Sequence, residues 1–126
     1  MAVPLRIMRI IWAALLVATL IYSAIAVTLG QRNAPLMQAH LHDPFVQIIY
    51  GIAAITFGVA FFMRSWMRDR GRPAQLYNIV SWALFESIAI YGLVPAMLHA
   101  DWRLMAAPEM LAFAGFALTF PEETTI

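Results

Sequence analysis

The chain has 126 residues but no cysteine and few charged side chains, and each shortage excludes something. Without cysteine there is no disulfide, no thiolate metal ligand and no thiol nucleophile. Charged residues make up 12% of the sequence, against about 25% in a typical soluble domain. The net charge is +1, and no basic cluster is interleaved with aromatic residues, so nucleic acid is not expected as a partner.

Common enzyme motifs are also missing. The sequence contains no G-x-x-x-x-G-K-[ST] phosphate loop, no G-x-G-x-x-G dinucleotide turn and no G-x-S-x-G nucleophile turn. We therefore expect neither enzymatic activity nor a bound cofactor.

Apolar residues are abundant instead, at 63% of the chain against roughly 45–50% in soluble domains. They form four blocks, at about residues 8–29, 46–63, 76–98 and 104–120. A helix needs about 20 apolar residues to cross a bilayer, and four strands cannot close a barrel. The sequence predicts an all-α fold: one membrane-embedded domain, residues 1–126, of four transmembrane helices. The fourth block is the shortest, and Pro108 either kinks its helix or sets its first turn.

Arginines predict how these helices are oriented. Positively charged residues concentrate on the cytoplasmic side of membrane proteins. Two arginines, Arg32 and Arg103, fall on one side of the four-span arrangement. The other side holds six: Arg6, Arg9, Arg64, Arg68, Arg70 and Arg72. Both termini are therefore predicted to be cytoplasmic, and a bacterial inner membrane is the natural location.

The first block has a second interpretation. Arg6 and Arg9, an apolar run and the small residues Ala24 and Ala26 also fit a secretory signal that is cleaved after about residue 26. The apolar run continues to Leu29 and further spans follow, which favours a retained helix. The intact mass of the purified protein distinguishes the two.

Glu86 is a carboxyl in the middle of the third block, within the stretch ALFESIAIYGLV. A charged side chain at the bilayer centre costs about 2.5–3.5 kcal/mol on insertion scales, so such residues are usually functional. Desolvation favours the neutral acid, and we expect Glu86 to be protonated unless a cation or water-filled path lies beside it. The hydroxyls nearest in sequence that could bond it are Ser81, Ser87 and Tyr91. The bland alternative is a protonated carboxyl that only bonds a neighbouring helix.

The same stretch resembles the ion-carrying helix of proteolipid (c) subunits of rotary F-type and V-type ATPases. The resemblance is carried by Glu86, Ala89 and the YGL of residues 91–93, and by GRP at residues 71–73, which is similar to the polar loop of that family. It covers about residues 46–98 and is concentrated in residues 72–98. It implies a helical hairpin in which Glu86 is the ion-binding carboxyl.

The chain departs from that family in three respects. The second block, IIYGIAAITFGVAFF, has small residues but no true glycine repeat. Pro95 follows the YGLV stretch inside the third block. The first and fourth blocks have no counterpart in a two-helix proteolipid. A divergent relative, with the hairpin framed by two extra helices, fits these departures.

Glu109 follows Pro108 near the start of the fourth block. In the first turn of a helix an acidic residue interacts favourably with the helix dipole, and the side chain could reach the membrane interface. The alternative is a second carboxyl on a proton path with Glu86.

Histidine and aspartate gather in the two predicted outer loops, in HLHD at residues 40–43 and HAD at residues 99–101. The candidate ligands are His40, His42, Asp43, His99 and Asp101. H-x-H in a loop is weak evidence for metal, and no H-E-x-x-H pattern is present, so we expect no metal site. No pair of histidines lies within the membrane to hold a haem there. The sequence leaves open whether a haem binds at the outer face.

Two functions follow from these patterns. One is a proteolipid-like protein that binds or relays a proton through Glu86, in a homo-oligomer or with other membrane subunits. The other is an accessory subunit of a larger membrane complex, in which Glu86 makes a packing hydrogen bond and the protein has no chemistry of its own.

Overall fold

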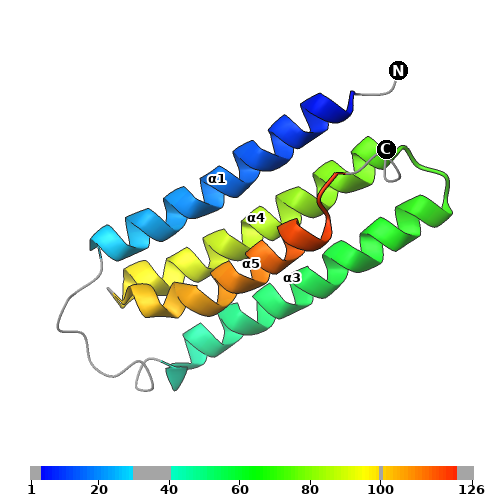
Figure 1. Cartoon of the computed structure of the whole chain (residues 1–126). Helices are drawn as coiled ribbons and strands as arrows, with labels where there is room; N and C mark the ends of the chain where they lie inside the picture. The colour runs from blue at the N-terminus through cyan, green and yellow to red at the C-terminus, as the bar shows by residue number, and fades with distance from the viewer. Residues whose placement is uncertain (1–3, 30–40, 100, 122–126) are drawn as a thin grey trace.

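The computed structural model describes residues 4–29, 41–99 and 101–121, and these residues contain helices and turns but no strand. The elements are α1 (Leu5–Leu29), α3 (Pro44–Asp69), α4 (Ala74–Leu98), the short 3-10 helix η1 (Trp102–Met105) and α5 (Ala106–Leu118) (Figure 1). The predicted all-helical fold is confirmed. Three helices, α1, α3 and α4, are long and apolar enough to cross a membrane.

Helix α3 is longer than the predicted block of residues 46–63. It begins after Asp43, whose carboxylate accepts a hydrogen bond of 2.9 Å from the amide of Phe45, and Pro44 occupies its first turn. It ends where Gly71 adopts a φ of 70°, a conformation that glycine reaches without steric cost. The predicted end at residue 63 is wrong because the polar residues that follow continue the helix beyond its apolar part.

The predicted fourth span, residues 104–120, is not one continuous helix. Its start belongs to η1, and α5 has only 13 residues. At 1.5 Å per residue, α5 is about 20 Å long, shorter than the roughly 30 Å of a hydrocarbon core. Pro108 lies in its first turn, where a missing amide hydrogen breaks no helical hydrogen bond.

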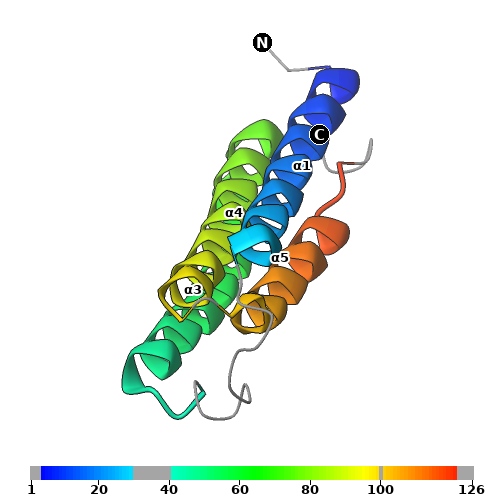
Figure 2. The ribbon, with the colours of Figure 1, turned by 90° about the vertical axis from the view of Figure 1, so that its left-hand side faces the viewer.

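Helix α4 is the centre of the bundle and contacts each of the other three helices. Figure 1 shows α1 and α4 running in one direction and α3 and α5 in the other. In the view of Figure 2, α1 runs between α4 and α5. The core is built on the large side chains of α4, among them Trp82, Phe85 and Ile88, with Phe116 of α5 against them.

The outer faces of α1 and α3 are apolar and exposed. In the most apolar stretch of each helix, only 11% of the residues of α1 and 17% of those of α3 are buried, against 44% for α4. Large side chains such as Ile10, Val17, Ile55 and Phe62 point away from the bundle. A bilayer, rather than water, is the solvent that suits such a surface.

Candidate functional site

Glu86 is the central residue of α4, and its side chain faces α1. The hydroxyl of Tyr22 in α1 donates a hydrogen bond of 2.8 Å to its Oε1. The Glu86 side chain is half-buried, so it is neither sealed in the core nor open on all sides. The geometry provides a carboxyl with one fixed donor and an uncovered part.

Two of the predicted hydroxyl neighbours are engaged elsewhere. Ser87 donates to the carbonyl of Ala83, at 2.9 Å. Ser81 donates to the carbonyl of Asn78, also at 2.9 Å, and accepts a hydrogen bond from Arg64. Tyr91 is half-buried and has no side-chain hydrogen bond among the residues described. The structure therefore brings none of these three to Glu86 and pairs it with Tyr22 instead.

Tyr22 is one of three hydroxyl residues on a single face of α1. Tyr22 and Ser23 lie three and four positions after Thr19, which places each of them beside Thr19 on the helix. The rest of the helix is almost wholly apolar. This spacing is a signal in the sequence, although it does not tell which helix the face meets.

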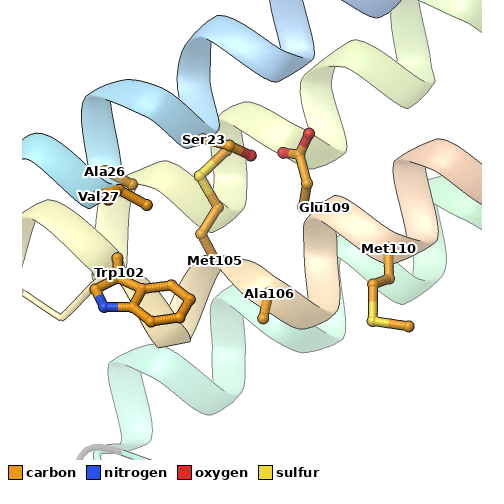
Figure 3. Close-up of a pocket in the computed structure, with 8 residues that line it drawn as sticks. All are labelled: Ser23, Ala26, Val27, Trp102, Met105, Ala106, Glu109 and Met110. Carbon is orange, nitrogen blue, oxygen red and sulfur yellow. The ribbon is translucent and has the colours of Figure 1, made fainter.

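Glu109 in the first turn of α5 is more deeply buried than Glu86. The first-turn position is confirmed, and the residue is only 6% exposed, so its side chain packs inside the bundle. Neither carboxyl oxygen has a hydrogen-bond partner within bonding distance and angle. The hydroxyls of Ser23 and Thr19 are the polar groups that face it. In Figure 3 the side chains of Ser23 and Glu109 point toward one another.

A cavity of about 220 Å³ lies beside this carboxyl, between α1 and the start of α5. Figure 3 shows its lining: Ser23, Ala26, Val27, Trp102, Met105, Ala106, Glu109 and Met110. Trp102 and Met110 are exposed and form its rim, while Met105 is buried. Glu109 is the only ionisable residue in this lining.

The outer-face histidines and aspartates form pairs. His99 Nε2 lies 2.9 Å from Asp43 Oδ2, which joins the end of α4 to the start of α3. Arg103 donates two side-chain hydrogen bonds, of 2.8 and 3.0 Å, to the carboxylate of Asp101, and these raise the pKa of the guanidinium. His42 is exposed, and His40 lies outside the described residues. Among the described residues no three potential ligands gather to hold a metal ion.

A second polar cluster joins α3 to α4 nearer the opposite end of the bundle. Arg64 donates to Asn78 Oδ1 at 2.8 Å and to Ser81 Oγ at 2.9 Å. Asn78 and Ser81 are fully buried, and Arg64 is half-buried. The arginine is predicted from sequence only as a loop charge, but α3 continues past it and turns it toward α4.

Comparisons of the chain with models of known families, with curated proteins and with solved structures found no match.

Proposed function

We propose that this chain is a small integral membrane protein that binds or relays a proton through Glu86. The observation that carries the proposal is a carboxyl at the centre of α4 that has one hydrogen-bond donor, Tyr22, and is not sealed by the core. A proton-carrying carboxyl needs a stable neutral form and access to a polar path or a partner. A half-buried glutamate with a single neutral donor is compatible with both.

Four crossings, with both termini in the cytoplasm of a bacterial cell, are the topology we propose. Arg9 Nε of α1 bonds the carbonyl of Pro121, and Trp82 Nε1 of α4 bonds Thr119. The segment after α5 therefore returns to the depth at which α1 begins. With η1 and the residues to Pro121 added, α5 covers more of the bilayer than its 13 residues alone.

The proposed relation to proteolipid subunits rests on the motif of α4 and on its pairing with α3. These two helices pack closely along their length, as a hairpin requires. A Cβ atom added at Gly51 or Gly58 of α3 would meet nothing within 4 Å, so this face is open to a second copy or another membrane subunit.

The first experiment is substitution of Glu86 by glutamine in protein reconstituted into liposomes. The amide oxygen of glutamine still accepts the Tyr22 hydrogen bond, so the fold is preserved while the proton site is lost. We expect proton flux to disappear in Glu86→Gln and wild-type protein to react with a hydrophobic carbodiimide at Glu86 near neutral pH. Unchanged flux in Glu86→Gln refutes the proposal.

The second candidate function is an accessory subunit, and the Tyr22 bond is the observation that favours it. A hydrogen bond between α1 and α4 is what a purely structural carboxyl would make. On this alternative Glu86→Gln is silent, Glu86→Leu loosens α1 from α4, and the protein copurifies with larger membrane subunits. Isolation of the chain as a stable, active homo-oligomer contradicts it.

A further inference from the structure

Glu109 is a buried carboxyl that the proposed proton site at Glu86 does not use. It is 6% exposed, and neither oxygen has a hydrogen-bond partner. An ionised carboxylate in this condition is very costly, since burial of a charge without a partner is penalised more than burial of a neutral polar group. The protonated, neutral acid is therefore the form in which Glu109 is best accommodated between transfers.

Among the residues that the structure describes, none beside Glu109 is a counter-ion that would stabilise the charged form. From α1 it faces two neutral hydroxyls, Thr19 and Ser23. From η1 the cavity receives Trp102 and Met105, which carry no charge. Arg103, the cation nearest in sequence, is bound to Asp101 by two side-chain bonds.

Helix α1 links the carboxyls of Glu86 and Glu109 through one face. Tyr22 donates to Glu86, and the residues at three positions before and one position after it, Thr19 and Ser23, interact with Glu109. Hydroxyls both donate and accept hydrogen bonds, which is what a proton relay needs. The carboxyls therefore lie on α4 and α5 and share α1 as a hydroxyl-bearing wall.

The position of the cavity beside Glu109 indicates from which side of the membrane a proton would reach this carboxyl. It lies where α5 begins and α1 ends, and its exposed rim residue Trp102 belongs to η1 outside α5. In the proposed topology this is the non-cytoplasmic end. The cavity is thus on the opposite side of Glu109 from the cytoplasmic ends of α1 and α4.

We infer that Glu109 is a second proton-binding carboxyl, loaded from the outer face through this cavity and placed in series with Glu86 along the hydroxyl face of α1. Proton transfer involves no other co-reactant: the proton leaves the Glu109 carboxyl, passes between hydroxyl oxygens and is taken up by the Glu86 carboxylate. The series arrangement rests on the proposed function of Glu86, whereas proton binding at Glu109 does not.

Infrared spectroscopy of the whole protein in phosphatidylcholine nanodiscs tests proton binding directly. A protonated carboxylic acid has a carbonyl stretching band that an ionised one lacks. At neutral pH we expect such a band in the wild type, a weaker band in Glu109→Gln and a persisting band in the matched control Glu86→Gln. If no protonated-acid band survives in Glu86→Gln, Glu109 is not a proton-binding carboxyl and the inference is overturned.

The route is tested by the rate at which that band shifts after transfer to deuterated water. Ala106 is exposed on the cavity lining, so Ala106→Phe fills the cavity without entering the core. We expect slower exchange at Glu109 in this variant. An unchanged exchange rate rules out the cavity as the path, and this measurement holds even if Glu109→Gln does not fold.

Proton flux in liposomes then separates the inference from the proposed function. Loss of flux in both Glu109→Gln and Glu86→Gln supports two carboxyls in series. Loss in Glu86→Gln alone makes Glu109 a bystander and overturns the series arrangement. Unchanged flux in Glu86→Gln defeats the proposed function, while the infrared band still decides whether Glu109 holds a proton.

Discussion

At the scale of single residues, the two carboxyls within the bundle are distinguished by their partners. Glu86 has a tyrosine donor and an uncovered part, whereas Glu109 is enclosed and faces the hydroxyls of Thr19 and Ser23 without a well-formed hydrogen bond. The two carboxyls therefore lie in different surroundings, although the side chain type is the same.

Removal of the Tyr22 hydroxyl tests the pairing with Glu86. Tyr22→Phe should lower the free energy of unfolding by about 0.5–1.5 kcal/mol, the net value of one hydrogen bond. The matched control is Tyr91→Phe, because Tyr91 is a half-buried tyrosine with no side-chain hydrogen bond among the described residues. Equilibrium unfolding in mixed detergent micelles measures both. Equal effects of the two substitutions would mean that the hydrogen bond between Tyr22 and Glu86 does not stabilise the fold.

At the scale of elements, α4 and α5 approach each other closely because glycine occupies two contact points. A Cβ atom at Gly92 would lie 2.6 Å from the Cβ of Pro108, and one at Gly115 would lie 2.5 Å from the ring of Phe85. Both distances are shorter than van der Waals contact. This close packing fixes the depth of α5, and with it the position of Glu109.

Alanine at Gly92 should therefore push α5 away from α4. We expect Gly92→Ala to lower the free energy of unfolding by about 1–3 kcal/mol, the usual cost of overpacking. Gly51→Ala on the open face of α3 is the control, and it should be neutral or stabilising by up to about 1 kcal/mol, since alanine is the better helix former. Thermal unfolding of the two variants in the same detergent compares them. A neutral Gly92→Ala would show that the contact yields easily.

Arg64 is the polar tie between α3 and α4. Arg64→Gln removes bonds to Asn78 and Ser81 and leaves buried acceptors without a donor, which costs about 1–3 kcal/mol. Arg68 is exposed on the same helix, so Arg68→Gln should change stability by less than about 0.5 kcal/mol. The rate at which a protease cleaves the loop between α3 and α4 compares the two variants, because a looser contact between these helices exposes the loop. Equal rates would mean that Arg64 contributes no more than a solvated charge.

At the scale of the whole molecule, the bundle separates an arginine-rich end from an end with paired histidine and aspartate. Arg68, Arg70 and Arg72 are exposed near the junction of α3 and α4. The ion pair between Asp43 and His99 joins the same two helices at the opposite end. A charge asymmetry of this kind sets orientation during insertion.

The absence of native cysteine makes this orientation directly measurable. Arg70 and His42 are exposed at opposite ends of α3, so each tolerates replacement by cysteine. We expect a membrane-impermeant maleimide to label His42→Cys in intact cells and Arg70→Cys only after the membrane is permeabilised. The reverse pattern would invert the proposed topology, and labelling of both in intact cells would place the two ends of α3 on one side.

The sequence alone determined the helical class, the apolar segments and the central position of Glu86 in its helix. These properties depend on local composition, on the hydrogen-bonding needs of a backbone in lipid and on a rise of 1.5 Å per residue, none of which requires a neighbour. The cap that Asp43 forms at the start of α3 is local for the same reason.

Only the tertiary structure decided which side chains meet. Tyr22 is 64 positions from Glu86, and Arg64 is turned toward Ser81 by the packing of α3 on α4. The burial of Glu109 follows from the packing of α5 against α1 and α4, which the sequence did not predict. Contacts between helices depend on the rotation and depth of each, which glycine contacts such as Gly92 against Pro108 set. In a chain that is apolar on nearly every helix face, periodicity does not encode them.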